Sequence, residues 1–368
     1  MKLHRLYLQN FRNYREQTFP LSPKQTILLG DNAQGKSNVL EAIFLLSTLK
    51  TYREGRDRDL IRFGANCAQI TGYGDQLELQ VILRSGSRRT LAINGVSQTK
   101  NTDFLGYLPV VLFSSLDLAL IRTSPETRRA WLDHTLMQLE PIYSNLSHEY
   151  QQVLRQKNAL LKHCRTQAQS LPPAEMAVWN HQLAQLGTKI MRRRWRLIHR
   201  LQPLAQQWQR RISAGQESLD IIYAPKLECA NWDDPAEIHT ALLTAMADKQ
   251  SIELWQGTSL VGPHRDEVQF HLNHVPARTY GSQGQQRTLI LALKLAELEL
   301  LELVLQKTPL LLLDDVLAEL DLHRQQQLLG VINDRVQTII TTTHLDNFDR
   351  AWQNQAQILR IHQGSIVP

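Results

Sequence analysis

The sequence predicts an α/β protein: a head of mixed parallel and antiparallel sheets with helices, split by an inserted helical lobe. Three observations lead to this prediction. A short apolar strand runs up to Gly30 and continues through a loop into a helical pattern. The segment that starts at Leu77 alternates with a period of two, which is typical of antiparallel strands. From about residue 125 to residue 214 the chain is rich in Gln, Arg, Leu and Trp at helical spacing.

The order of these elements sets the expected domain boundaries. Turns at Ser85-Gly86-Ser87 and Asn94-Gly95 predict hairpins in the alternating segment, and Leu171-Pro172-Pro173 predicts a break between two helices. From Trp255 the strand pattern resumes, followed by a helix, the strand PLLLLDD, another helix and the strand QTIITTTH. We therefore expect the head to comprise residues 1–122 and 255–368, and the mainly helical lobe to comprise residues 123–254.

The composition narrows the class of protein. With 42% hydrophobic residues among 368, the chain can bury a core, and its net charge of +6 favours an acidic partner such as nucleic acid. Cys67, Cys164 and Cys229 are widely separated, which favours a reducing compartment over a disulfide framework or a structural zinc site. The N-terminus has no apolar segment of the signal-peptide kind, and no apolar run approaches the length of a membrane span. We expect a soluble, cytoplasmic protein.

A phosphate-binding loop is predicted directly after the strand Thr26–Leu29. The pattern G-x-x-x-x-G-K-[ST] lies between an apolar strand and a helix, which is the context that this motif requires. Its backbone N–H groups are expected to cradle phosphates, its lysine to contact the β- and γ-phosphates of ATP, and its serine hydroxyl to bind Mg²⁺. The residues of the expected ATP site are Gly30, Asp31, Asn32, Ala33, Gln34, Gly35, Lys36 and Ser37.

An acidic pair supplies the partner that such a loop needs. The apolar run PLLLL predicts a strand buried on both faces of a parallel sheet, and Asp314 and Asp315 follow it at the edge where α/β proteins bind ligands. We expect Asp314 to hold Mg²⁺ through water and Asp315 to orient or deprotonate an attacking water. His344 ends the next apolar strand; it is a candidate catalytic sensor of the γ-phosphate, or a solvated loop histidine.

A second glycine-containing helix entrance, TYGSQGQQRT, precedes a leucine-rich helix but carries no lysine. Two basic clusters are candidate DNA contacts. The first comprises Arg53, Arg56, Arg58 and Arg62, and we favour phosphate contact for it. In the second, Arg192, Arg196 and Arg200 share one face of a predicted helix, which is either a solvated cationic face or a DNA face.

These motifs, in this order, resemble the ATP-binding-cassette ATPases, and within them the RecF family of bacterial recombination and repair ATPases, which is related to the SMC family. The resemblance covers most of the chain except the middle helices. It rests on LQNFRNY, GDNAQGKSNVLEAI, LIRFG, FSSLDLALIRTSPETRRAWLD, GPHRDE, YGSQGQQRT and LLLLDDVLAELD.

The resemblance implies a role for the second entrance. In cassette ATPases two heads pack face to face, and each lends its serine-glycine entrance to the nucleotide on the other. Asp321 corresponds to the D-loop, the turn that follows the acidic strand in this family. The signature residues that would complete a neighbour's site in trans are Ser282, Gln283, Gly284 and Gln285.

The resemblance also implies a function. It predicts a weak, DNA-stimulated ATPase that uses ATP and Mg²⁺ and forms an ATP-dependent homodimer on duplex DNA near single-strand gaps. Such a protein acts in DNA replication, recombinational gap repair and the SOS response, helps to load the recombinase RecA together with RecO and RecR, and is nucleoid-associated in the cytoplasm.

One segment departs from the family pattern. Ser114-Ser115-Leu116-Asp117 stands where RecF-like chains usually have Ser-Pro-Glu-Asp, in a loop that contacts Mg²⁺ and the γ-phosphate in relatives. Three other classes stay open: the nucleotide-binding subunit of a membrane transporter, a small SMC-like structural ATPase, and a P-loop kinase. Transporter signatures usually have Leu-Ser-Gly-Gly-Gln, an SMC-like protein needs a long heptad arm, and a kinase needs neither Ser282 nor His344.

Overall fold

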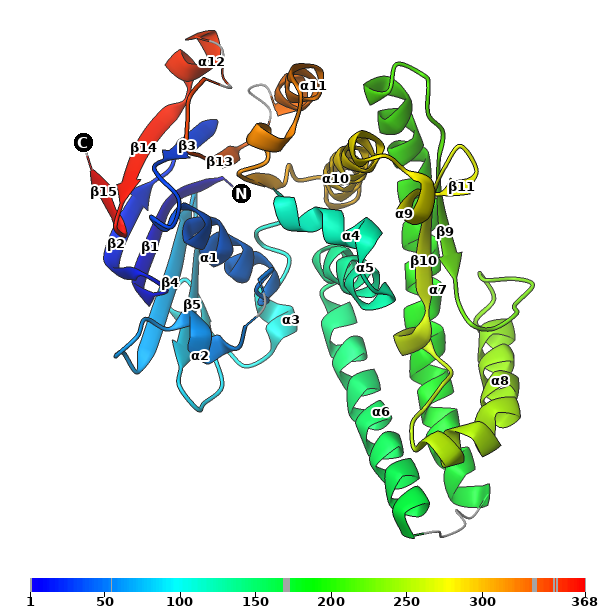
Figure 1. Ribbon diagram of the computed structural model, residues 1–368. Helices are drawn as coiled ribbons and strands as arrows, with labels where there is room; N and C mark the ends of the chain where they lie inside the picture. The colour runs from blue at the N-terminus through cyan, green and yellow to red at the C-terminus, as the bar shows by residue number, and fades with distance from the viewer. Residues whose placement is uncertain are drawn as a thin grey trace. The chain divides into compact units, whose positions relative to one another are not determined.

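The computed structural model describes residues 2–53, 55–167, 173–332, 336–346, 348 and 350–367, and Figure 1 shows its helices and strands. The chain forms two compact units. The first, called the head below, comprises Met1–Leu118, Gln207–Gln216 and Gln283–Pro368, and the second comprises Ala119–Gln206 and Glu217–Ser282.

A mostly parallel sheet of six strands forms one layer of the head. Its order is β15-β14-β3-β13-β12-β8, and neighbouring strands are parallel except for β14 and β15. Because parallel strands align their carboxyl ends, the segments after β3, β12 and β13 meet at one edge. The strands are β3 (Gln25–Leu29), β8 (Val110–Ser114), β12 (Leu310–Asp314), β13 (Thr338–Thr342), β14 (Gln357–His362) and β15 (Ser365–Val367).

An antiparallel sheet forms the second layer of the head, in the order β2-β1-β4-β5-β6-β7. The predicted hairpin turn at Asn94-Gly95 is confirmed: it joins β6 to β7, and both residues have the positive φ that a tight turn of this kind requires. The strands are β1 (Leu3–Phe11), β2 (Tyr14–Pro20), β4 (Cys67–Gly74), β5 (Glu78–Arg84), β6 (Thr90–Ile93) and β7 (Val96–Gln98).

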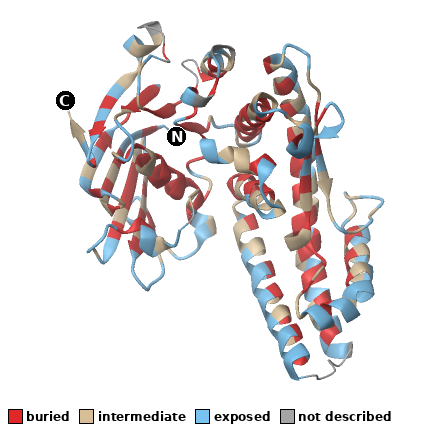
Figure 2. Ribbon diagram, viewed as in Figure 1, coloured by how far each residue is buried: buried red, intermediate tan, exposed pale blue. Residues whose placement is uncertain are grey.

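The core of the head lies between these layers and around α1 (Lys36–Thr48). Apolar residues of both sheets and of α1 form one buried cluster, and Figure 2 shows these segments in red. α1 is apolar on almost all sides, as expected of a helix enclosed within a core. The other head helices are α2 (Asp57–Leu60), α3 (Asn101–Phe104), α10 (Gln283–Leu305), α11 (Leu322–Ile332) and α12 (Arg350–Gln355), with short 3₁₀ turns at Ser115–Leu118 and Leu317–Glu319.

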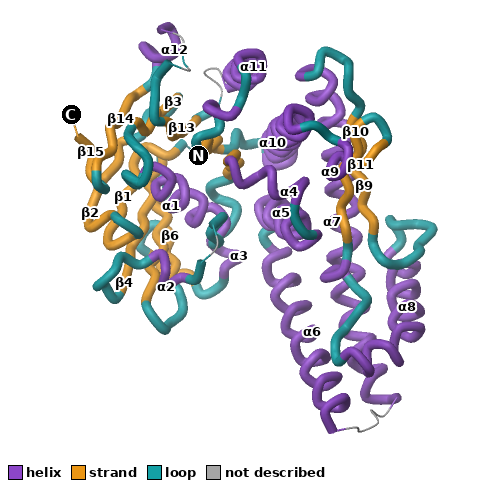
Figure 3. The backbone as a smooth tube through the Cα atoms, viewed as in Figure 1, coloured by secondary structure: helices purple, strands orange, loops and turns teal. Residues whose placement is uncertain are grey.

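The second unit is mainly helical, as the purple segments in Figure 3 show. Its small antiparallel sheet has the order β11-β10-β9. Among the described residues, no helix of either unit has the length and apolar character needed to cross a membrane. The elements are α4 (Ala119–Arg122), α5 (Pro125–Leu139), α6 (Ile142–Gln167), α7 (Pro173–Ile212, whose last turns belong to the head), β9 (Leu219–Ala224), α8 (Pro235–Gln256), β10 (Glu267–Leu272), β11 (Val275–Pro276) and α9 (Ala277–Tyr280).

The boundary predicted at residue 255 differs from the structure. Trp255 lies inside α8, and residues 255–282 belong to the second unit. The physical reason is the pairing of β10, whose neighbours among the described strands are β9 and β11 of the second unit and not a head strand. Alternation along one strand does not reveal which strand it pairs with. Of the predicted break at Leu171-Pro172-Pro173, the first two residues lie outside the described residues, and α7 begins at Pro173.

The GPHRDE segment supplies a buried polar network to the second unit. His264 accepts a hydrogen bond from the Tyr150 hydroxyl at 2.7 Å, and burial lowers its pKa to about 4. Asp266 accepts a hydrogen bond from the Tyr223 hydroxyl and lies 3.5 Å from the Arg194 guanidinium. Burial outweighs the attraction of Arg194 and raises the pKa of Asp266 to about 6. These side chains connect α6, α7, β9 and β10.

Candidate nucleotide site

The predicted phosphate loop connects β3 to α1, which begins at Lys36. Gly35 has a φ of 111°, and a Cβ there would lie 2.5 Å from the Asn13 side chain and 2.9 Å from the Tyr14 hydroxyl. A Cβ on Gly30 would lie 2.3 Å from the backbone oxygen of Ile361. Both positions therefore require glycine, one for its conformation and both for close packing.

The turn between β1 and β2 holds the loop from the antiparallel layer. Asn13 donates a hydrogen bond to the Gln34 carbonyl at 3.0 Å, and Tyr14 donates one to the Gly35 carbonyl at 3.0 Å. Asn38 in turn donates to Asn13 at 2.8 Å. Burial raises the pKa of Tyr14, so its phenol stays protonated as a donor. Asn13 and Tyr14 belong to the LQNFRNY segment. From the sequence, this segment supported only the family resemblance, and its support of the phosphate loop was not predicted.

Lys36 lies within the loop and is 6% exposed. Its ammonium donates to the carbonyl oxygens of Gly30 at 2.6 Å and Asp31 at 2.8 Å. Burial lowers the pKa of Lys36, and the nearby carboxylates of Asp315, Asp314 and Asp31 offset part of that effect. The side chain is a desolvated cation with neutral partners, as suits a contact for phosphate oxygens.

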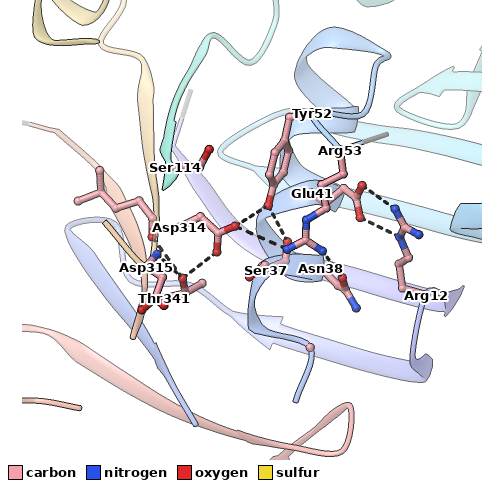
Figure 4. Close-up of polar contacts among 12 residues, drawn as sticks. Arg12, Ser37, Asn38, Glu41, Tyr52, Arg53, Ser114, Asp314, Asp315 and Thr341 are labelled. Atoms are coloured by element: carbon pink, nitrogen blue, oxygen red, sulfur yellow. Dashed lines mark hydrogen bonds and ion pairs between the residues drawn. The ribbon is translucent and has the colours of Figure 1, made fainter. Parts of the chain in front are cut away.

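The structure brings Asp314 to the loop, at the end of β12. It is 8% exposed, and its two oxygens accept hydrogen bonds from Thr341 at 2.9 Å and from the Tyr52 hydroxyl at 2.9 Å (Figure 4). The same hydroxyl lies 3.2 Å from the Ser37 carbonyl oxygen. Tyr52 thus links the carboxylate to the first turn of α1, and burial raises its pKa, which keeps it a donor.

Asp314 and Ser37 fit the requirements of a magnesium site. Mg²⁺ in nucleotide sites is held by one or two protein oxygens, with phosphates and water completing its shell. A carboxylate and a serine at the first turn of α1, joined through Tyr52, provide such a donor set. Among the described residues there is no group of three or more His, Cys, Asp or Glu side chains suited to a metal, and a site of this type needs none.

Asp315 and His344 follow β12 and β13 at the same edge. Asp315 is exposed and has a φ of 58°, a left-handed conformation uncommon for a residue with a side chain. Its N–H donates to the Thr341 hydroxyl at 2.9 Å, so Thr341 fixes both aspartates. His344 is exposed, and its N–H lies 3.3 Å from the Thr342 hydroxyl.

The loop after β8, where the sequence departs from the family pattern, is anchored by Asp117. The Asp117 carboxylate accepts a hydrogen bond from the Ser114 N–H at 2.6 Å and lies 3.0 Å from the ammonium of Lys294 on α10. Glu297 lies 3.6 Å from the same ammonium. Leu116 is 53% exposed. Asp117 therefore ties this loop to α10.

The signature residues lie where predicted, at the start of α10. Gln283 is its first residue, Ser282 immediately precedes it, and the Gly284 carbonyl accepts a hydrogen bond from Thr288 at 3.0 Å. The hydrogen bonds around this entrance also involve α11, whereas those around the phosphate loop involve the β1–β2 turn and the β14–β15 hairpin. Asp321 precedes α11 and pairs with Arg324.

Three arginines of the first basic cluster, Arg53, Arg58 and Arg62, line one pocket, and Arg56 is not among its lining residues. Arg53 donates to Asn38 at 3.0 Å and lies 3.6 Å from Asp314, so it belongs to the nucleotide site (Figure 4). Arg58 and Arg62 line a pocket of about 860 Å³ beside the loop. The other residues used below that line this pocket are Arg12, Asn13, Asn38, Arg53 and Phe63. Arg56 precedes α2 and is exposed.

Arg12 and Arg196 have structural partners. Arg12 makes two hydrogen bonds of 2.8 Å to Glu41, which is fully buried on α1, so it joins the β1–β2 turn to that helix (Figure 4). In the second cluster, Arg196 pairs with Asp233 at 2.8 Å. Arg200 is exposed, and the Nε atom of Arg192 is buried. The pairing of Arg196 favours the structural interpretation of that helix face.

Comparison with known proteins identifies the family. The model of the "RecF/RecN/SMC N terminal domain" matches residues 2–366. The "DNA replication and repair protein RecF" of Synechococcus sp. (strain JA-3-3Ab) is 53% identical over 373 residues, which cover 100% of this chain and 98% of that protein. The chain belongs to the RecF family. The RecF protein of Cyanothece sp. (strain PCC 7425 / ATCC 29141) is likewise 53% identical, over 100% of this chain and 98% of its own length.

Solved structures agree with this assignment. One described as "the recombination mediator protein RecF-ATPrS in RecFOR pathway" has a TM-score of 0.91 and 28% identity, covering 99% of this chain and 97% of its own. An SMC head domain from Pyrococcus furiosus, at a TM-score of 0.55 and 17% identity, shares the fold. The predicted ATPase head of the ATP-binding-cassette type, with mixed sheets and an inserted helical unit, is confirmed.

Proposed function

We propose that this chain is an ATP-dependent DNA-binding protein that dimerises on duplex DNA and hydrolyses ATP weakly. The main support is the convergence of Lys36, Ser37 and Asp314 at one sheet edge, with Tyr52 and Thr341 fixing the carboxylate. A relative with the same fold is described with ATP bound. Relatives at about half identity carry the name of DNA replication and repair proteins.

Each residue at the sheet edge has a distinct task. Lys36 exchanges its carbonyl partners for the β- and γ-phosphate oxygens of ATP, while the loop N–H groups bind the remaining phosphate oxygens. Ser37 and Asp314 would hold Mg²⁺, which would neutralise phosphate charge. Asp315 orients the attacking water or accepts its proton, and His344 contacts the γ-phosphate. A short aspartate reaches water less well than glutamate, which accords with slow turnover.

The pocket beside the loop receives the base and ribose. It adjoins Asn13 and Asn38, which themselves support the loop and α1. Phe63 lines it and is fully exposed, so its ring is available to stack on a base. Arg58 and Arg62 also line the pocket, so two of the arginines that we assign to DNA below border the nucleotide.

A second copy of the chain completes the site. Ser282, Gln283, Gly284 and Gln285 present the positive end of a 23-residue helix, suited to a γ-phosphate on a neighbouring head. No lysine is needed there, because the neighbour's own loop supplies Lys36. Asp321 reaches the same composite site from the D-loop.

Duplex DNA is contacted through phosphates. Arg56, Arg58 and Arg62 are exposed and follow Arg53, which is engaged at Asp314. We therefore assign the DNA contact to these three arginines and not to Arg53, so that the segment joins the nucleotide site to the DNA. Binding through phosphates predicts a steep dependence on salt and little dependence on base sequence.

The names of the relatives support a cellular role. Solved RecF structures are described within a RecFOR pathway, which supports RecO and RecR as partners and recombinase loading at single-strand gaps as the outcome. We extend this role to replication, gap repair and the SOS response. Membership of the RecF family disfavours the transporter subunit and the kinase.

Sedimentation tests the proposal. The chain is expected to sediment as a monomer alone and as a dimer with ATP and duplex DNA together. Asp315→Asn is expected to keep ATP binding and to slow hydrolysis by about 10²- to 10⁴-fold, so that the dimer persists on DNA. A chain that stays monomeric with ATP and DNA, or an Asp315→Asn variant that hydrolyses ATP at the normal rate, would contradict it.

A further inference from the structure

Arg324, in the first turn of α11, makes contacts to another helix. Its Nε donates to the Thr288 hydroxyl on α10 at 2.8 Å, and its Nη2 donates to the Gly284 carbonyl at 3.2 Å. Thr288 also donates to the Gly284 carbonyl, at 3.0 Å. The guanidinium thus holds the first turn of α10, directly at the signature residues.

The same guanidinium holds Asp321. Its Nη1 pairs with one oxygen of the Asp321 carboxylate, and the Arg324 N–H donates to the other oxygen at 2.9 Å. One planar group therefore binds three acceptors: a hydroxyl and a carbonyl of α10, and the carboxylate before α11. A lysine has a single ammonium and lacks the planar fork that matches three separated acceptors.

These contacts lie apart from those that hold the phosphate loop. The loop is held by Asn13, Tyr14 and the β14–β15 hairpin, and Asp314 is held by Tyr52 and Thr341. Loss of Arg324 should therefore leave the loop of its own chain intact. It should instead release Asp321 from the start of α10.

We propose that Arg324 is a positioning residue that fixes the signature entrance and Asp321 as one preformed surface for the nucleotide on a second copy of the chain. This inference rests on the proposed dimer, in which both elements act in trans. An unfixed surface would have to be ordered during dimerisation, which weakens the closed dimer and slows hydrolysis.

The first test compares binding with turnover. Arg324→Ala is expected to bind ATP as monomer with unchanged affinity and to lose at least about tenfold in hydrolysis rate and in ATP-dependent dimerisation. Arg84→Ala is the matched control, because Arg84 also donates to a threonine hydroxyl in the head but on β5. It should behave as the parent. Weakened ATP binding by the Arg324→Ala monomer would overturn the proposal.

The second test assigns Arg324 to one side of the composite site by mixing variants. Lys36→Ala removes the loop lysine, and Ser282→Arg blocks the signature. A mixture of these two forms heterodimers with one intact site, and its recovered hydrolysis sets the reference. Arg324→Ala mixed with Lys36→Ala should recover to the same level. Arg324→Ala mixed with Ser282→Arg should not recover, because each site then lacks a sound signature surface.

The outcomes separate the inference from the proposed function. If the reference mixture recovers and the Arg324→Ala and Lys36→Ala mixture does not, although crosslinking confirms heterodimers, Arg324 has no role in trans. Recovered ATP hydrolysis in the mixture of Arg324→Ala and Ser282→Arg would also overturn the inference. If the reference mixture itself forms heterodimers without recovery, completion in trans is wrong, and this inference falls with it.

A more conservative substitution tests the inference even if Arg324→Ala does not fold. Thr288→Val removes one acceptor of the guanidinium and keeps the shape of the side chain, whereas Thr288→Ser keeps the hydroxyl. We expect Thr288→Val to lower hydrolysis about three- to tenfold, with recovery on mixing with Lys36→Ala, and Thr288→Ser to match the parent. Equal hydrolysis by the valine and serine variants would count against the role of Arg324.

Discussion

Two buried lysines, one in the phosphate loop and one in the second unit, differ in what surrounds them. Lys36 donates to the neutral carbonyl oxygens of Gly30 and Asp31. Lys157 on α6 is fully buried and donates to the Glu253 carboxylate on α8 at 2.7 Å, with Ser259 3.4 Å away. Among the described residues, no carboxylate forms an ion pair with the Lys36 ammonium, whereas the Lys157 ammonium pairs with Glu253. A buried charge indicates a ligand site only when the protein itself leaves it without a counter-charge.

The largest effect is expected on the free energy of unfolding when the buried ion pair between Lys157 and Glu253 is broken. Lys157→Ala leaves Glu253 buried without its counter-ion and should lower the free energy of unfolding by about 3–5 kcal/mol. ATP affinity of the folded chain should not change. Denaturant unfolding measures the first quantity and nucleotide titration the second. Lys162→Ala, an exposed position on the same helix, is the control, and equal stability of the two variants would contradict the comparison.

Lys36→Ala should show the reverse pattern. ATP affinity is expected to fall by about 10- to 100-fold, because the phosphates lose a charged donor. The free energy of unfolding without nucleotide should hardly change, since burial already disfavours the charged form of Lys36. Titration and unfolding of the same preparation measure both, with the exposed Lys100→Ala as control. A large loss of stability would make Lys36 a structural residue like Lys157.

A smaller effect is expected at Tyr52. Tyr52→Phe keeps the ring packed edge-on against Phe44 but removes the hydroxyl that holds Asp314. The Mg²⁺ concentration for half-maximal nucleotide binding should rise by about tenfold, as is typical when a partner of a metal ligand is lost. Binding measured without Mg²⁺ should stay the same. An unchanged Mg²⁺ requirement would mean that Thr341 alone orients the carboxylate.

The smallest effect is expected on the pH dependence of the free energy of unfolding, through two buried titratable groups of the second unit. His264, with its pKa lowered to about 4, contributes stability that increases as pH rises from there towards its ordinary value, because the unfolded chain binds more protons. Asp266, with its pKa raised to about 6, contributes the opposite slope below that pH. Each slope is at most about 1.4 kcal/mol per pH unit, so the two nearly cancel.

Removing one group should therefore expose the slope of the other. Between the two pKa values, the free energy of unfolding of Asp266→Asn should rise with pH more steeply than that of the parent, and that of His264→Gln less steeply. ATP affinity should not follow either profile. Urea unfolding at several pH values gives the slopes, and parallel profiles for the three proteins would refute the assignment.

The sequence predicted the parts of the site that are continuous in the chain. The phosphate loop, the acidic pair after β12 and the entrance of α10 each combine a local motif with its strand or helix, and the structure has them in those places. Tyr52 and Arg324 were missed, because their tasks depend on contacts with residues of distant segments, Asp314 and Gly284. The contact of Arg53 with Asp314 was missed for the same reason, since Asp314 lies on a distant strand, and the assignment of Arg53 to DNA stays a prediction.

The position of β3 in its sheet affects when the nascent chain can fold and bind nucleotide during synthesis. β3 carries the phosphate loop and emerges from the ribosome long before its two neighbours, β13 and β14, which come much later in the chain. Gln363 and Gly364 then donate hydrogen bonds to Gln34 of the loop. Because β3 cannot pair before β13 and β14 are made, and pairing between segments so far apart is slow, we expect the nascent chain to expose an unpaired apolar strand until then. Competence to bind nucleotide should therefore arise abruptly, after residues 338–364 have left the ribosome, and a chaperone that shields β3 until then would raise the yield of active protein.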